Sequence, residues 1–318
     1  MAKANVTIVG LGFVGSSIGL ALKKSGADIS ITGHDKEPGI AREALKIKAV
    51  DRTDWNLINA CEKADIVILA LPLQAIQDTM KVIGPYLKPG CLVTDTATLK
   101  RPVIKWAEEL LPDHVNFVGG NPIISPQGEA GGVKAASAEV LKGALYCLTP
   151  SPEASGEAIE LAVALVKAMG ASPYFVDPAE HDGLLAGIEQ LPLVAAAALM
   201  GTLCQSPPWK EMRRFGSSAF NQGTASLWEG SLLWARAFLE NADNVIRWID
   251  GYISQLEMLK QSLKDKDEET LNVYFSRAVD ERARWLKDKT SGLWEEIPEP
   301  PRTPGVLETF LGVRFKKP

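Results

Sequence analysis

The sequence predicts an α/β protein, with a doubly wound, mainly parallel sheet in its first half and an all-α second half. Two observations lead to this prediction. Short runs rich in Ile, Val and Leu alternate with helical patterns up to about residue 176. From residue 178 onward, every periodic segment has helical spacing. We therefore expect a sheet domain at 1–176, a helical domain at 177–289 and a Pro-rich tail at 290–318.

The predicted strands are continuous apolar runs, which are typical of strands buried on both faces of a parallel sheet. They are Val6–Val9, Ile29–Thr32, Ile66–Leu71, Leu92–Asp95, Asn116–Gly119, Ala144–Leu148 and Pro173–Asp177. The helices predicted between them are Val14–Ser25, Ile40–Lys46, Gln74–Tyr86 and Arg101–Leu111. This alternation predicts parallel strands joined by crossover helices.

Two amphipathic helices are predicted near the end of the second half. Apolar residues recur at spacings of three and four through Asn241–Leu263, and the pattern repeats from Leu271 to Trp285. Asp265 and Glu268 have the spacing of a capping box. This spacing predicts that they open the second helix.

A third helix, His181–Leu203, is long and almost uncharged. It contains Glu189, Gln190 and Pro192, which a membrane-spanning helix would rarely carry. We therefore predict a buried helix and no membrane association. A partner subunit is the natural candidate to cover it.

The composition is that of an ordinary globular protein, with 46% hydrophobic and 23% charged residues among 318. The net charge of −5 lacks the basic footprint of a general nucleic-acid binder. The N-terminus has no signal-peptide pattern, which favours a cytoplasmic protein.

The cysteines lie far apart without metal-ligand spacing, which predicts reduced, buried thiols and no metal site. They are Cys61, Cys91, Cys147 and Cys204.

A glycine-rich loop stands between the first predicted strand and the first predicted helix. Gly10 allows a tight turn, Gly12 lets the backbone approach a pyrophosphate, and Gly15 lets helix and strand pack closely. The helix start at Phe13 and Val14 offers amide donors and a favourable dipole to phosphates. The loop therefore predicts a dinucleotide site of the Rossmann type. An ordinary strand–helix turn is the alternative.

Asp35 lies 20 residues after Gly15, at the end of the second predicted strand. A carboxylate at this position accepts hydrogen bonds from the adenosine ribose and repels a 2′-phosphate. We therefore predict NAD as the cofactor. The neighbouring Lys36 is the argument for NADP.

Three further residues follow predicted strands at the edge where ligands bind in such folds. Leu71 and Pro72 end one strand, and Thr96 follows another. We expect them to line the cofactor site. The alternative is that they are simple strand ends.

Seven segments, in order along residues 5 to 288, resemble segments of a known family. They are VTIVGLGFVGSSIGLALK, ITGHDKE, ADIVILALPLQAI, VTDTATLK, FVGGNPIIS, HDGLLAGIEQLPLVAAAAL and LENADNVIRWIDGYISQLEMLKQSL. Together they resemble the prephenate/arogenate dehydrogenase family. The resemblance implies a Rossmann domain followed by a helical dimerisation domain, and hence a homodimer.

The resemblance also implies an oxidative decarboxylation in tyrosine biosynthesis. A hydride leaves the carbinol carbon of a cyclohexadienol for NAD(P)+, and the ring loses carbon dioxide and becomes aromatic. The small-molecule substrate would be prephenate or arogenate. The product would be 4-hydroxyphenylpyruvate or tyrosine.

The catalytic residues implied by the resemblance are partly altered. The family's Gly-Gly-His-Pro has Asn121 at its histidine, and an amide cannot take a proton near neutral pH. The family's Asp-x-Gly-Ser-x-Lys keeps a hydroxyl at Thr98 and a charge at Lys100. We expect these three residues to polarise and position the substrate, with a surface lysine as the alternative for Lys100. His181 is a candidate substitute proton acceptor. Alternatively, it is part of a polar pair with Asp182 at a helix start.

Amides also replace basic residues of the family in the second half. The family's Ser-His-Leu-Pro-His has Gln190 at its first histidine, and its Phe-Arg-Asp-x-Thr-Arg has Asn221 and Gln222 in place of Arg-Asp. We expect these amides to bind substrate. Arg213 and Arg214 are expected to be solvated or paired, with a displaced carboxylate clamp as the alternative. Amides fit a less anionic substrate. Alternative functions are therefore a dehydrogenase or imine reductase for such a substrate, and a catalytically weak NAD-binding regulator.

Overall fold

The computed structural model describes residues 3–124, 131–227 and 231–291. These residues contain an eight-stranded sheet with the order β3-β2-β1-β4-β5-β6-β7-β8. All neighbouring strands are parallel except β6 and β7. The predicted mainly parallel sheet is therefore confirmed. The strands are β1 (Ala4–Val9), β2 (Ile29–His34), β3 (Arg52–Thr53), β4 (Ile66–Leu69), β5 (Leu92–Asp95), β6 (Asn116–Pro122), β7 (Leu145–Pro150) and β8 (Ser172–Phe175).

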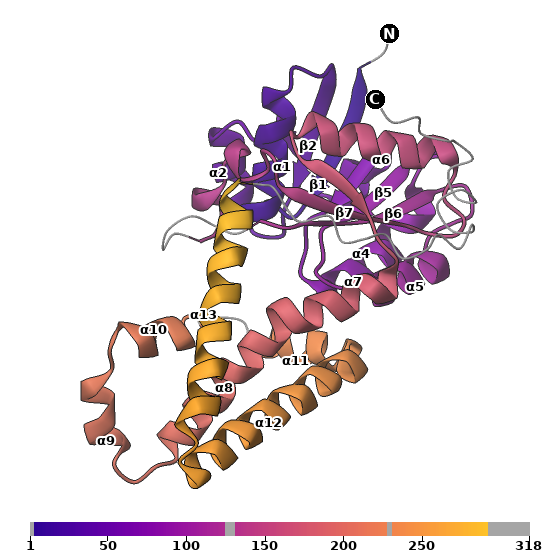
Figure 1. Cartoon of the computed structure of the whole chain (residues 1–318). Helices are drawn as coiled ribbons and strands as arrows, with labels where there is room; N and C mark the ends of the chain where they lie inside the picture. Colours follow the sequence, from indigo (N-terminus) through magenta and orange to yellow (C-terminus); the bar gives the residue numbers. More distant parts are fainter. Residues whose placement is uncertain (1–2, 125–130, 228–230, 292–318) are drawn as a thin grey trace. The chain divides into compact units, whose positions relative to one another are not determined.

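Helices cover both faces of this sheet (Figure 1). On one face, α3, α4 and α5 pack on apolar side chains of β1, β4, β5 and β6. Figure 1 shows α6 on the opposite side of the sheet from α4 and α5. The helices of this part are α1 (Phe13–Lys24), α2 (Pro38–Lys46), α3 (Leu57–Cys61), α4 (Leu73–Ile83), α5 (Arg101–Leu110) and α6 (Gly156–Ala168).

In the sheet part of the chain, one strand and two α-helices are absent from the sequence prediction. β3 and α3 are too short to show a period. α6 is apolar on most of its sides, so it gives little helical periodicity despite its 13 residues. Its start is nevertheless well defined, because the Ser155 hydroxyl accepts a hydrogen bond from the Ala158 amide at 3.2 Å.

Two strand ends differ from the prediction in a way that matters for the site. β4 ends at Leu69, because the chain turns there and α4 begins after Pro72. β6 continues to Pro122, because the antiparallel strand β7 pairs with it as far as Asn121 and Pro122. Asn121 is therefore fixed within a strand, where the predicted strand stops at Gly119.

The later part of the chain is helical among the described residues. A π-helical turn, Ala186–Gln190, joins α7 to α8. The chain divides into two compact units, Met1–Val245 and Ile246–Pro318, so the first unit includes the helices up to α11. The helices are α7 (Pro178–Leu185), α8 (Leu191–Cys204), α9 (Trp209–Met212), α10 (Ser218–Thr224), α11 (Ser231–Glu240), α12 (Ala242–Asp265) and α13 (Glu268–Ser291).

Within one chain, the described residues bury little of the long apolar helix, so its burial against a partner subunit stays a prediction. Ala196 is the one residue of α8 that is buried, and Cys204 at its end is exposed, whereas the other cysteines are buried. The helical stretch Pro178–Cys204 is long and apolar enough to span a membrane by length and composition, and only 11% of an apolar 18-residue segment within it is buried. Among the residues that the structure describes, most of the apolar side chains of this helix are at least partly exposed.

The predicted cap of the last helix is wrong. Asp265 ends α12, and the turn that follows includes Lys266 at a φ of 54°. Asp267 caps α13 instead, because its carboxylate accepts hydrogen bonds from the Thr270 amide, at 3.0 Å, and from the Thr270 hydroxyl, at 2.6 Å. The Pro-rich tail lies, from residue 292 onward, outside the described residues.

Candidate active site

The glycine loop has a different steric constraint at each of its three glycines. Gly10 has a φ of 91°, and a Cβ there would lie 2.3 Å from the carbonyl oxygen of Ala70. A Cβ on Gly15 would lie 1.9 Å from the carbonyl oxygen of Gly10. A Cβ on Gly12, in contrast, meets no atom within 4 Å. Gly10 and Gly15 therefore serve the turn and its packing, whereas Gly12 faces open space that a ligand can enter.

The first turn of α1 has no side chain that caps it. Its amides, which include those of Phe13 and Val14, are thus available to an anion. Asp35 holds the loop from the side, because its half-buried carboxylate accepts hydrogen bonds from the amides of Leu11, at 2.8 Å, and Glu37, at 2.9 Å. The open face at Gly12, the uncapped helix and the carboxylate together fit a dinucleotide.

These glycines give a paired prediction. We expect Gly15→Ala to destabilise the protein by about 1–3 kcal/mol or more, because its Cβ collides with backbone. We expect Gly12→Ala to leave the urea midpoint near that of the wild type but to weaken NADH binding, measured by fluorescence titration. Equal stability of the two variants would contradict this assignment.

The remaining predicted cofactor residues lie at the carboxyl edge of the sheet. Leu71 and Pro72 follow β4, which neighbours β1, and Pro72 precedes α4. Thr96 follows β5, and its amide donates a hydrogen bond to the carbonyl of Leu69 at 3.2 Å. The strand order places this edge at the switch point between β1 and β4, where ligands bind in such sheets.

Asn121 and His181 meet beside this edge, although 60 residues separate them in the sequence. The amide nitrogen of Asn121 lies 3.2 Å from Nε2 of His181, and both side chains are buried. Nδ1 of His181 lies 3.0 Å from a carboxylate oxygen of Asp182. Because a carboxylate only accepts, Nδ1 donates, and Nε2 of the neutral ring then accepts from Asn121. The imidazole is thus oriented with its basic nitrogen toward Asn121.

Asp182 fixes this histidine and also a helix end. Its carboxylate accepts hydrogen bonds from the amides of Lys100, at 2.7 Å, and Arg101, at 3.0 Å. These amides begin α5, which has no cap of its own. The backbone carbonyl of Asp182 accepts a hydrogen bond from the Asn241 side chain at 2.9 Å. Asp182 therefore joins α7 to α5 and to the start of α12.

Lys100 is fully buried, which excludes the surface-lysine alternative. Its ammonium donates to the buried carboxylate of Asp95 and, at 2.6 Å, to the carbonyl of Gly120. The other carboxylate oxygen of Asp95 accepts the Gly120 amide at 3.0 Å. Burial of the ammonium group lowers the pKa of Lys100 below its ordinary value. The charge of the Asp95 carboxylate opposes this shift without cancelling it. The ammonium is thus enclosed by protein, whereas Thr98 nearby is exposed.

The predicted amide set is not brought together. Gln190 uses both ends of its amide within the chain, because its oxygen accepts from Asn241 at 2.7 Å and its nitrogen donates to the carbonyl of Ala237 at 3.4 Å. Asn221 and Gln222 are exposed on α10, which packs against α8. Arg213 and Arg214 are exposed on the turn before α10.

The sequence predicts no place in the site for Asp95 or Glu189, and it predicts Asp182 only as the partner of His181 in a polar pair. Glu189 lies in the π-helical turn, a feature often found at functional sites. The residue is exposed overall, but desolvation of its carboxyl group raises the pKa of Glu189 above its ordinary value. Two signals in the sequence could have drawn attention to these residues. Asp95 is the first residue of the segment that resembles the family's Asp-x-Gly-Ser-x-Lys, and Glu189 replaces the first residue of the family's Ser-His-Leu-Pro-His.

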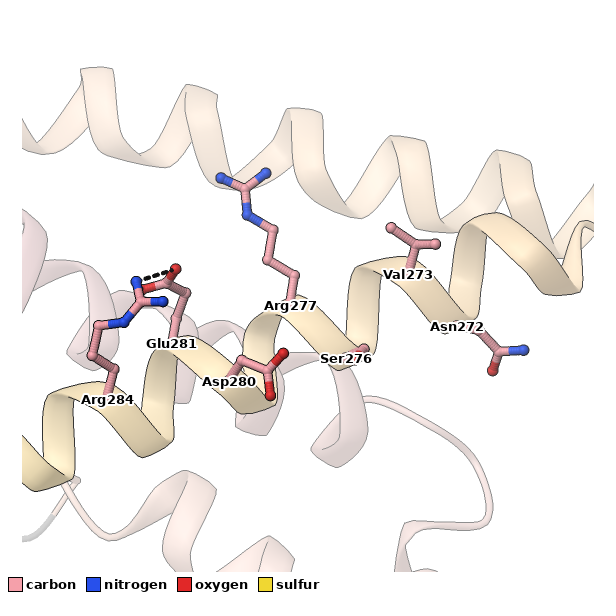
Figure 2. Close-up of a pocket in the computed structure, with 7 residues that line it drawn as sticks. All are labelled: Asn272, Val273, Ser276, Arg277, Asp280, Glu281 and Arg284. Carbon is pink, nitrogen blue, oxygen red and sulfur yellow. Dashed lines mark hydrogen bonds and ion pairs between the residues drawn. The ribbon is translucent and has the colours of Figure 1, made fainter.

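A shallow hollow also lies on α13 (Figure 2). Its lining residues all belong to that one helix, and Arg284 pairs with Glu281 across one turn. It contains none of the residues at the strand ends. In the described ranges 3–124, 131–227 and 231–291, no group of three or more His, Cys, Asp or Glu side chains could hold a metal.

Comparison with known families gives two matches that together cover most of the chain. Residues 18–174 match the model of the prephenate dehydrogenase nucleotide-binding domain. Residues 177–277 match the model of the prephenate dehydrogenase dimerization domain. The glycine loop lies just before the first matched range.

Individual relatives agree with these matches. The prephenate dehydrogenase of Bacillus subtilis is 29% identical over 98% of this chain and 85% of its own. The cyclohexadienyl dehydrogenase of Zymomonas mobilis is 26% identical over 86% of this chain and 93% of its own. The crystal structure of A. aeolicus prephenate dehydrogenase with hydroxyphenyl propionate and NAD+ has a TM-score of 0.81 and 26% identity, covering 89% of this chain and 99% of that chain. Synechocystis arogenate dehydrogenase shares the fold, with a TM-score of 0.74 over 88% of this chain and 99% of that chain, at 24% identity.

Proposed function

Because the chain belongs to the prephenate dehydrogenase family, we propose that it is an NAD-dependent dehydrogenase that oxidises and decarboxylates prephenate or arogenate. The observation that carries this proposal is the contact between Asn121 and His181, beside the edge of the sheet that presents the glycine loop. A hydroxyl-binding amide and an oriented imidazole are what an alcohol oxidation requires of a protein. The bound nicotinamide would supply the hydride acceptor.

The proton of the substrate hydroxyl is assigned to His181. Asn121 cannot take a proton, but its amide N–H can donate to the substrate oxygen as that oxygen becomes a carbonyl. Nε2 of His181 lies 3.2 Å from the same amide nitrogen and accepts the hydroxyl proton. Asp182 then stabilises the imidazolium through Nδ1. The exposed hydroxyl of Thr98 is available to position the substrate.

NAD is the proposed cofactor because the Asp35 carboxylate stands beside the glycine loop. We expect wild-type protein to bind NADH at least about ten-fold more tightly than NADPH, since a second negative charge meets this carboxylate. Asp35→Asn keeps an oxygen acceptor and removes the charge, so it should narrow that preference. Fluorescence titration with both cofactors measures this. Tighter wild-type binding of NADPH would contradict the assignment.

The proposed activity is tested by NADH formation from NAD+ with prephenate and then with L-arogenate. Wild-type protein and Asn121→His are assayed together. Robust wild-type turnover supports the proposal, and means that Asn121 with His181 suffices. No wild-type turnover of either substrate, with NADH binding intact, would overturn it and favour a dehydrogenase or imine reductase for a less anionic substrate. Activity gained only in the variant would locate the divergence at residue 121.

The proposed assembly is a homodimer through the helical part of the chain. The match to a dimerization domain supports it, and so do the apolar side chains exposed on and before α8, which include Ile188 at 77% and Leu199 at 40% exposure. We expect sedimentation at the mass of a dimer, and a shift toward monomer in Leu199→Glu. Lys210→Glu on α9 is the exposed control. A monomeric wild-type protein would contradict this proposal.

A cytoplasmic location is proposed as well. The four cysteines are all free thiols, which is usual in a reducing compartment. Fractionation of cells that express the tagged chain tests the location, and recovery outside the soluble fraction would contradict it.

A further inference from the structure

We infer that the buried Asp95–Lys100 pair is a positioning device that sets the contact between Asn121 and His181. The inference rests on the proposed function, and it assigns Lys100 to a role that acts through other residues. Both charged side chains are completely buried, so neither is open to solvent. A buried charge pair is seldom a net source of stability, so its presence beneath the site calls for another explanation.

The side chains of the pair hold the strand that carries Asn121. The Gly120 amide donates to Asp95, and the Gly120 carbonyl accepts from the Lys100 ammonium. Both polar groups of the residue before Asn121 are thus bound to the same ion pair. A Cβ on Gly120 would lie 2.7 Å from the Asp95 carbonyl oxygen, so the strand can approach this closely only because it has a glycine there.

The backbone of Lys100 holds the other partner. Its amide donates to Asp182 at 2.7 Å, and the same carboxylate oxygen lies 3.0 Å from Nδ1 of His181. Lys100 is therefore hydrogen-bonded through its side chain to Gly120, the neighbour of Asn121. Through its backbone amide it is hydrogen-bonded to Asp182, the partner of His181. The charges hold the Gly120 peptide, and the Lys100 backbone holds Asp182, so removing the charges frees one side of this arrangement. We expect this to loosen the 3.2 Å contact between the side chains of Asn121 and His181.

The test is the double variant Asp95→Asn/Lys100→Met in the full chain. Removing both charges avoids leaving one of them unpaired, and the Lys100 amide bond to Asp182 is kept. We expect kcat to fall by about 10²-fold, with the KM and the NADH Kd near their wild-type values. The control is Lys105→Met, which removes an exposed lysine of the same helix. Wild-type kcat in a folded double variant would overturn the inference.

A second readout does not depend on turnover. The chain has three histidines, so the imidazole ¹⁵N resonances of His181 can be separated from those of His34 and His114. We expect the double variant to shift the His181 resonances alone, and Lys105→Met to shift none. Unchanged His181 resonances would overturn the positioning role. If wild-type protein turned over neither substrate while these resonances still shifted, the proposed function would fail and the positioning role would stand.

Discussion

His181→Asn is expected to lower kcat by about 10²–10⁴-fold with whichever substrate is turned over, because it removes the imidazole that contacts Asn121. Asparagine keeps an N–H near the position of Nδ1, so the bond to Asp182 can persist and the protein should still fold. It offers no nitrogen that can accept a proton at the position of Nε2. Steady-state kinetics and an NADH titration separate the loss of kcat from any loss of cofactor binding.

The matched control for this variant is His114→Asn. Nε2 of His114 lies 3.1 Å from the carbonyl of Leu87, away from the carboxyl ends of the strands. We expect its kcat to equal that of the wild type. If His181→Asn also retained full kcat, His181 would be a structural member of a polar pair, and the hydroxyl proton would have to leave by another route.

The parts of the fold that the sequence predicts are those in which local pattern and final environment agree. Leu92–Asp95 is predicted to the residue, because a buried parallel strand needs a continuous apolar run. α6 is missed, since a helix that is apolar on most of its sides has no contrast between faces. The burial of α8 stays a prediction, because the pattern shows an apolar surface but does not show which molecule covers it.

The residues of the site also differ in how far local sequence predicts their roles. The glycine loop is local, and its steric roles follow from three positions in one turn. The contact of Asn121 with His181 joins residues that are 60 positions apart in the sequence, and no local pattern around either residue predicts it. Lys100 shows the limit most clearly. Its charge suggests a ligand contact or a solvated surface, and only the tertiary structure reveals a fully buried pair with Asp95.

The single variant Lys100→Met is expected to be the most destabilising of the charge changes in this region. It removes one partner of a buried pair and leaves the Asp95 carboxylate without its countercharge. Breaking such a pair costs about 3–5 kcal/mol, whereas an exposed pair contributes about 0–1 kcal/mol. Urea unfolding followed by tryptophan fluorescence measures the difference, with Lys105→Met, at an exposed lysine that pairs with Glu109, as the control.

Adding Asp95→Asn to Lys100→Met should recover much of the lost stability, because the unpaired charge is then gone. The side-chain oxygen of the new asparagine can still accept the hydrogen bond from the Gly120 amide. This recovery distinguishes a charge effect from a packing defect, since the methionine side chain is present in both variants. A single variant no less stable than Lys105→Met would mean that Asp95 tolerates the loss of its partner. In that case the pair would not be a charged unit in the folded protein, and a neutral pair would have to hold the Gly120 peptide.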